Sequence, residues 1–139
     1  MNRVVFEGKL TGDKKHGFTP GLHGLHIHAG EDITTCGNGT THLMGHMQNV
    51  NGNAQHGHPT NTLPNRHPGD LGNIFVNRKG TGDVWITDTI VSLDRDHDYF
   101  IGGRGMVLHE KVDDFVTPDT GNAGFRVGCC IISDIMVIN

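Results

Sequence analysis

The sequence predicts an all-β fold, either an antiparallel sandwich or a barrel, and three observations favour it. Glycine supplies 21 of the 139 residues, about twice its usual share of roughly 7%. Alanine, the best helix former, occurs only three times, which argues against a helical bundle. The apolar segments are short and turn residues separate them, as in antiparallel β proteins. The length fits a single domain over residues 1–139.

The expected strands follow one another along the chain, each bounded by turn-forming residues. Asp13 ends the first strand, a glycine-rich turn at 80–82 separates the third from the fourth, an acidic turn at 94–96 follows the fifth, and glycines at 102–103 follow the sixth. The strands are predicted at 4–10, 22–28, 74–76, 84–87, 89–93, 99–101, 105–109 and 129–137. Two polar segments, 29–71 and 112–124, have no strand pattern. A loop as long as 29–71 requires a metal or a disulfide to order it.

Charge and hydropathy exclude several classes of function. The formal net charge is −4 and the isoelectric point about 6.2, so no electrostatic footprint for nucleic acid is present. The longest apolar run, 129–132, is far shorter than the ~20 residues of a membrane helix. The first residues contain no apolar signal-peptide core, so we expect a cytoplasmic protein. Three cysteines are too few for a disulfide scaffold.

Histidine is the most unusual feature, because its 11 copies equal Lys and Arg combined. His26 and His28 alternate on one strand and share a face, so both can bind one metal ion. The loop that follows adds further imidazoles and one carboxylate, and a last imidazole ends a distant strand: His42, His56, His58, His67, Asp70 and His109. Such ligands suit zinc and copper. The alternatives are polar surface residues, or a loop that binds metal loosely.

Four segments resemble motifs of the Cu/Zn superoxide dismutase family, and they occur in the family's order. Residues 21–28 are similar to its copper-binding strand and 66–73 to the end of its zinc loop, while 109–114 and 121–129 resemble its later motifs. The resemblance runs from about Val4 to the C-terminus. It implies the immunoglobulin-like Greek-key β-barrel of that family. Only one strand precedes the copper motif here, so the first hairpin of that barrel is expected to be missing.

The resemblance also implies a role for each ligand. His42 is expected to bridge the two metals, because it follows Cys36 at the family's interval. His56 fits the motif H-G-x-P over 56–59, whereas the family's interval to His67 favours His58, so both stay open. Asp113 is implied to link a copper ligand to a zinc ligand. The implied copper ligands are His26, His28, His42 and His109, and the implied zinc ligands are His42, His56, His67 and Asp70.

Further roles follow from the same resemblance. It implies that Arg126 is the active-site arginine and that Cys36 and Cys129 form a disulfide. The implied reaction is the conversion of superoxide to oxygen and hydrogen peroxide by a homodimeric enzyme that a copper chaperone loads. The alternative is a non-catalytic member of the fold that only binds copper and zinc.

Several other residues are interpreted as structural. His23 faces away from His26 and is expected to make structural hydrogen bonds. Asp88 is expected to pair with Arg66. The remaining histidines, His16, His46 and His97, are interpreted as surface or turn residues.

Overall fold

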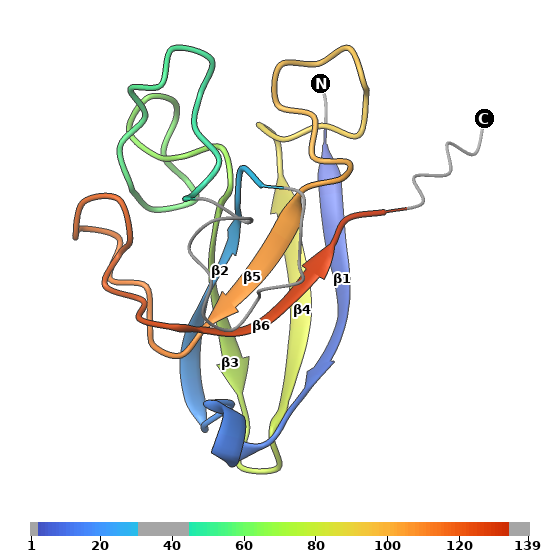
Figure 1. Ribbon diagram of the computed structural model, residues 1–139, viewed down its shortest axis with the longest axis vertical. Helices are drawn as coiled ribbons and strands as arrows, with labels where there is room; N and C mark the ends of the chain where they lie inside the picture. Colours follow the sequence, from blue (N-terminus) through green and yellow to red (C-terminus); the bar gives the residue numbers. More distant parts are fainter. Residues whose placement is uncertain (1–2, 31–44, 134–139) are drawn as a thin grey trace.

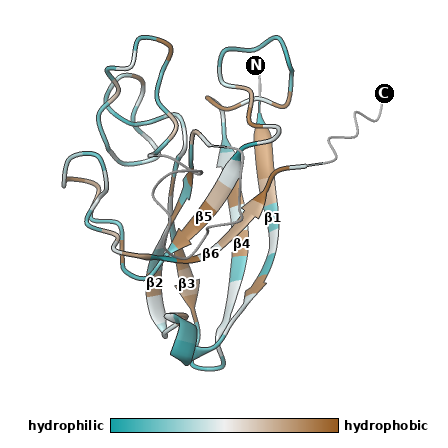
Figure 2. Ribbon diagram, viewed as in Figure 1, coloured by the Kyte–Doolittle hydropathy of each residue, from teal (hydrophilic) through white to brown (hydrophobic). Residues whose placement is uncertain are grey.

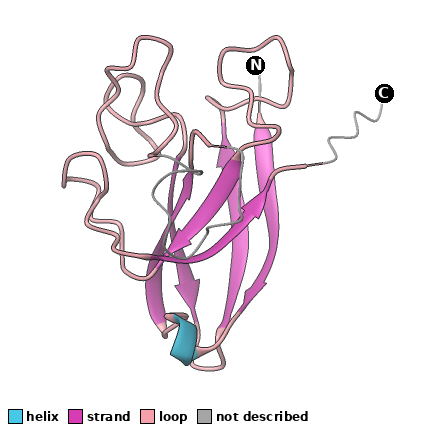
Figure 3. Cartoon of the chain, viewed as in Figure 1, coloured by secondary structure: helices cyan, strands magenta, loops and turns pink. Residues whose placement is uncertain are grey.

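A computed structural model describes residues 3–30 and 45–133, which form one antiparallel sheet (Figures 1 and 3). A short 3₁₀ helix, η1 (Lys14–His16), follows the first strand. The strands are β1 (Val4–Thr11), β2 (Gly21–Ile27), β3 (Asp70–Val76), β4 (Thr81–Asp88), β5 (Gly105–His109) and β6 (Arg126–Ile131). In the described part of the chain, no helix is long and apolar enough to cross a membrane.

The sheet order is β1-β4-β3-β2-β5-β6, and every neighbouring pair is antiparallel. The sheet curls into a half-barrel, so that β5 and β6 pass in front of β4 and β1 in Figure 1. Its concave side holds the apolar core, in which Ile27, Val76, Val91 and Ile101 are fully buried. Figure 2 shows that strands are the more hydrophobic parts of the chain and that the long loops are mostly polar. The all-β prediction is therefore confirmed, and a single strand precedes β2 as expected.

Two of the predicted strands, 89–93 and 99–101, are wrong. These segments meet only at an isolated bridge between Ser92 and Phe100. The reason lies in Asp88, whose carboxylate accepts the backbone N–H groups of Ile90 and Val91 at 2.7 and 2.9 Å. Because a side chain takes these donors, the segment turns into the core instead of joining a ladder.

The ends of two other strands differ from the prediction. β3 begins at Asp70, four residues before the expected start at Ile74, and β6 begins at Arg126. The last part of the strand predicted at 129–137 lies outside the described residues. The earlier starts matter for function, since Asp70 and Arg126 are both candidate site residues at strand ends.

Candidate metal centre

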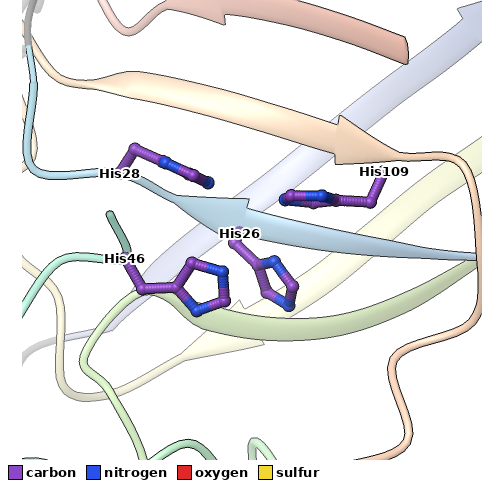
Figure 4. Close-up of side chains that lie close together, drawn as sticks. All are labelled: His26, His28, His46 and His109. Carbon is purple, nitrogen blue, oxygen red and sulfur yellow. The ribbon is translucent and has the colours of Figure 1, made fainter. Parts of the chain in front are cut away.

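Strand β2 carries His26, and His28 follows its last residue, so both imidazoles lie on the same side of the sheet, as the alternation predicts. His26 is fully buried and His28 nearly so. β5 ends beside them at His109, and His46 reaches them from the long loop. Figure 4 shows these four rings facing one another. Each offers one nitrogen, and the four nitrogens lie within 4.8 Å of one another, which suits a single metal ion.

A second group lies next to the first and shares two of its members. It consists of His26, His46, His56 and Asp70, whose ligand atoms also lie within 4.8 Å of one another. Asp70 is its centre, because its Oδ1 lies 3.2 Å from Nδ1 of His46 and 3.2 Å from Nδ1 of His56. The same oxygen lies 3.3 Å from Nδ1 of His67. One carboxylate oxygen therefore faces three imidazole nitrogens, a donor set typical of zinc.

Backbone groups hold the second carboxylate oxygen of Asp70. Its Oδ2 accepts the N–H groups of His67 at 2.9 Å and Gly57 at 3.1 Å. A side chain at Gly57 would collide with the backbone carbonyl of Asn65, so only glycine allows this turn of the loop. The loop is thus wrapped around Asp70 by contacts that leave Oδ1 directed at the imidazoles.

Asp113 joins the two groups from the opposite side. Its two carboxylate oxygens lie 2.7 Å from Nε2 of His26 and 2.7 Å from Nε2 of His56. Asn73 fixes Asp113 in turn, because its amide donates to the Asp113 carbonyl and accepts the Asp113 N–H. Such outer contacts set the orientation of a ligand ring and decide which nitrogen carries a proton.

His46 is the residue that sequence reasoning missed. Its interpretation as a surface or turn residue is wrong, since it is buried and belongs to both groups. A short β contact with His28 positions it, and the N–H of the neighbouring Met47 donates to the carbonyl of Ile27 at 2.9 Å. Met47 is buried in the core, and an apolar residue inside a polar loop is the signal that could have located this anchor. His42, to which the sequence assigned the bridge, lies outside the described residues.

The structure places His56 and His58 in different surroundings. His56 is buried between Asp70 and Asp113. His58 is exposed, lies 2.7 Å from the Thr60 hydroxyl and packs against the ring of Phe115. The geometry therefore brings His56, and not His58, into the cluster.

Burial and charge shift the pKa of several site residues in opposite directions. Burial lowers the pKa of His46 and that of His109 to about 4 in each case. Burial would also lower the pKa of His56, but hydrogen bonds to Asp113 and Asp70 outweigh it and raise that pKa to about 9. Burial opposes ionisation of Asp70 too, yet hydrogen bonds from its three histidine neighbours hold its pKa well below the usual range. The positive charge of a protonated His56 ring, or of a metal cation in its place, compensates the negative charges of Asp70 and Asp113.

The imidazole nitrogens at the centre fit a metal. His26 Nδ1 and His109 Nε2 are buried and have no hydrogen-bond partner within the described ranges. Buried polar atoms normally have partners, so these nitrogens point to a ligand that binds them. Neutral imidazole is a ligand of both copper and zinc, and thus the residues suit either ion.

Arg126 lies at the rim of this cluster. Its Nη2 is 3.4 Å from Nδ1 of His28, and the side chain is partly exposed. The cation is therefore placed between solvent and the buried imidazoles, where it can attract a small anion.

A buried ion pair fastens the long loop to the sheet. Arg66 and Asp88 are both buried, and Nη2 of Arg66 donates to Oδ2 of Asp88. The same guanidinium donates to the carbonyls of Pro59, His67 and Pro68. The predicted pair is present, and it anchors the segment that carries His67 and Asp70 to the end of β4.

Two further predictions concern His23 and the cysteines. His23 is buried, and its ring nitrogens lie 2.7 Å from the His109 carbonyl and 2.6 Å from the Thr19 carbonyl, a structural role as predicted. Cys130 carries a free thiol. Cys36 lies outside the described residues, so its pairing with Cys129 stays a prediction.

A curled antiparallel sheet with buried histidine groups around shared carboxylates defines a β-barrel metalloprotein with adjoining metal sites. The family model for copper/zinc superoxide dismutase matches residues 2–132. Superoxide dismutase Cu-Zn 2 of Mesembryanthemum crystallinum is 39% identical over 132 residues, which cover 91% of this chain and 76% of that protein.

Two further relatives are also superoxide dismutases. Superoxide dismutase Cu-Zn 2 of Brassica juncea is 42% identical over 133 residues, 91% of this chain and 82% of its own length. An extracellular superoxide dismutase of Haemonchus contortus is 38% identical over 122 residues, 84% of this chain and 62% of its own length. The chain belongs to the copper/zinc superoxide dismutase family. Copper and zinc are the cofactors of this family, and the histidine groups suit both ions.

Proposed function

We propose that this chain is a superoxide dismutase that converts two superoxide anions and two protons to oxygen and hydrogen peroxide. Family membership supports the activity, and the observation that carries it is the pair of buried groups that share His26 and His46. Copper supplies one-electron redox chemistry at such a site, and zinc, which has none, orders the loop. No feature of the described residues favours the non-catalytic alternative.

We assign copper to the group of His26, His28, His46 and His109. An all-imidazole set suits copper, and Arg126 beside His28 supplies the positive charge that draws superoxide to this group. Zinc is assigned to the nitrogens that face Asp70, namely those of His46, His56 and His67. The carboxylate in this set favours zinc over copper.

His46 takes the bridging role that the sequence assigned to His42. Its Nδ1 faces Asp70, so Nε2 is left for the group that contains His28 and His109. With a nitrogen in each group, the His46 ring can hold a proton at Nε2 and release it to the reduced product. Proton transfer by a positioned imidazole of this kind is general acid catalysis.

The same proposal includes a homodimer, delivery of copper by a chaperone, a Cys36–Cys129 disulfide and a cytoplasmic location. Family resemblance supports the disulfide and the dimer, and the free thiol of Cys130 is consistent with pairing of the other two cysteines. Non-reducing mass spectrometry of peptides tests the disulfide directly.

The test of the activity combines metal analysis with a superoxide-removal assay. His109→Ala should lower the copper content, leave zinc nearly unchanged and abolish superoxide removal, because His109 belongs to the first group only. His58→Ala is the matched control, since His58 is exposed and should leave metal content and rate unchanged. A fully metallated wild-type protein without activity would refute the proposed function.

A further inference from the structure

Two turns meet at the end of the sheet that lies opposite the loops 45–69 and 89–104. One turn contains η1, and the other joins β3 to β4 (bottom of Figure 1). The N–H of Gly12 donates to the carbonyl of Gly80 at 3.0 Å. A side chain at Gly80, whose φ is 73°, would collide with the carbonyl of Gly12. Glycine at position 80 therefore allows the two turns to pack directly against each other.

The two turns give this end of the molecule a positive charge. Their exposed cationic side chains are Lys14, Lys15, Arg78 and Lys79. Within the described part of the chain, none of these four forms an ion pair. Residues 7–16 and 77–85 together contain five basic and three acidic side chains, a net charge of +2. Because the whole chain carries −4, the remainder carries −6, and the positive charge is confined to this basic end.

Large apolar side chains are exposed on the outer face of the sheet, beside the basic end. Leu22 and Phe75 lie directly opposite each other in the β2–β3 pair, and they are 48% and 63% exposed. Trp85 is 70% exposed and points outward from the adjacent strand β4, since its neighbour Val84 is buried in the core. We call Leu22, Phe75 and Trp85 the outer apolar patch. Exposed apolar side chains that gather beside polar ones are typical of an interaction surface.

The shape of this surface favours a lipid bilayer as its partner. The core fills the concave side of the curled sheet, so the outer face is convex and offers no groove to a peptide. Lipid head groups, in contrast, rearrange around a convex surface. Basic side chains attract anionic head groups, and apolar side chains enter the boundary between head groups and acyl chains. Tryptophan is enriched at that boundary.

The distribution of charge favours the same partner. The acidic turn at 94–96 lies at the other end of the sheet, away from the basic end, so it adds little repulsion from an anionic surface (Figure 1). An acidic polysaccharide would also bind the cations, but it would leave the outer apolar patch in water. The combination of both features therefore points to anionic lipid.

We propose that the basic end and the outer apolar patch form a binding surface for membranes of anionic lipids. Lys14, Lys15 and Lys79 contact the head groups, and Leu22 and Phe75 enter the boundary below them. This surface shares no residue with the two metal groups, so the proposal is independent of the proposed activity.

Cosedimentation of the metal-loaded protein with vesicles tests this surface. The wild type should bind equimolar phosphatidylcholine and phosphatidylserine vesicles and should not bind vesicles of phosphatidylcholine alone. The double variant Lys14→Ala, Lys15→Ala should bind about 25-fold more weakly, because each cation near an anionic surface raises the affinity about fivefold. Arg95→Ala, which removes a cation from the acidic turn at the other end, is the control and should bind like the wild type.

Phe75→Ser tests the apolar part of the surface. It should weaken vesicle binding by roughly tenfold, since the ring leaves water when the protein binds. Val116→Ser is the matched control, because Val116 is 79% exposed but lies on a different loop. Urea unfolding of each variant checks that the fold is retained, which is expected for exposed positions.

Trp85 gives a readout that needs no label, because it is the single tryptophan of the chain. Phosphatidylserine vesicles should shift its emission to shorter wavelength and protect it from quenching by acrylamide. An unshifted emission in the vesicle-bound protein would overturn the proposal.

Heparin in place of vesicles separates the two kinds of anionic partner. Binding to heparin without binding to vesicles would identify an acidic polysaccharide and refute a lipid surface. A wild type that binds neither, or vesicle binding that Phe75→Ser leaves unchanged, would refute it as well, whatever the superoxide-removal activity of the samples.

Discussion

His46 connects the two halves of the site, as His26 also does. It is buried, faces Asp70 through Nδ1 and belongs to both candidate metal groups. His46→Ala is therefore expected to reduce copper and zinc content together, whereas His109→Ala reduces copper alone. Metal analysis by plasma mass spectrometry after dialysis measures both ions.

His42→Ala is the matched comparison, because the sequence gives His42 the role that the geometry gives His46. We expect His42→Ala to keep both ions. The reverse outcome, with zinc and copper lost from His42→Ala and retained in His46→Ala, would return the bridge to His42.

The histidines also predict how the metal-free protein responds to pH. The pKa of His46 and His109 falls from 6.5 in the unfolded chain to about 4, so the unfolded state binds more protons in this range. Their contribution to the free energy of unfolding is complete above pH 6.5 and is lost as the pH falls towards 4. His56 acts in the opposite sense, because its pKa rises to about 9. Its contribution is complete below pH 6.5 and is lost as the pH rises towards 9.

The metal-free protein should therefore be most stable near pH 6.5, as measured by urea unfolding between pH 4 and 9. His56→Ala should remove the loss of stability on the alkaline side and keep the loss on the acidic side. An unchanged alkaline loss in this variant would show that His56 is not the group responsible.

Residue patterns could predict part of this site for a physical reason. His26 and His28 share a strand, and the period of a strand fixes their common face without any knowledge of the fold. His46 joins them through a loop whose path depends on the burial of Met47 and on a contact with Ile27. The interval from Cys36, on which the prediction of His42 depends, carries no such constraint, because loop length varies freely, and it gave no reason to consider His46.

At the scale of elements, the ion pair between Arg66 and Asp88 decides how the metal loop sits on the sheet. Asp88→Ala would leave the buried guanidinium of Arg66 unpaired and free the N–H groups of Ile90 and Val91. Loss of one partner of a buried pair costs about 3–5 kcal/mol. We expect a loss of that size in the free energy of unfolding, measured by urea titration.

Zinc affinity should fall in the same variant, since Arg66 also holds the carbonyls of Pro59 and Pro68 around the ligand segment. Asp83→Ala, at an exposed carboxylate on the same strand, is the control and should change stability by less than about 1 kcal/mol. Equal losses in the two variants would contradict a special role for the buried pair.

The strands show what short apolar runs can and cannot predict. Runs bounded by glycine or aspartate located β1, β2, β4 and β5 within a few residues. The run at 89–93 is equally apolar, and Val91 is fully buried, yet it is no strand. Its side chains follow the apolar pattern of a strand, but its backbone N–H groups donate to Asp88. Hydropathy alone does not predict the hydrogen-bond partners of backbone N–H groups.

At the scale of the whole molecule, net charge and local charge act on the substrate in opposite senses. The chain carries a net charge of −4, which repels an anion at long range. Arg126 stands at the rim of the histidine cluster, 3.4 Å from His28, and provides an opposite field where it is needed. The sequence could predict the presence of this arginine from the motif, but its position at the rim follows from the sheet order, in which β6 pairs with β5 and sets Arg126 opposite His109.

Arg126→Ala should therefore slow superoxide removal by roughly tenfold, within the range of 10 to 10³ by which local fields raise association rates. Because salt screens attraction, the wild-type rate should fall as ionic strength rises, and the variant should lose that dependence or reverse it. Arg126→Lys should keep most of the rate and its salt dependence, since it retains the charge. Arg78→Ala removes the same charge from an exposed turn between β3 and β4 and should change neither. Stopped-flow rates over a range of salt concentrations make the comparison, and an unchanged salt dependence in Arg126→Ala would exclude the attraction of superoxide by this residue.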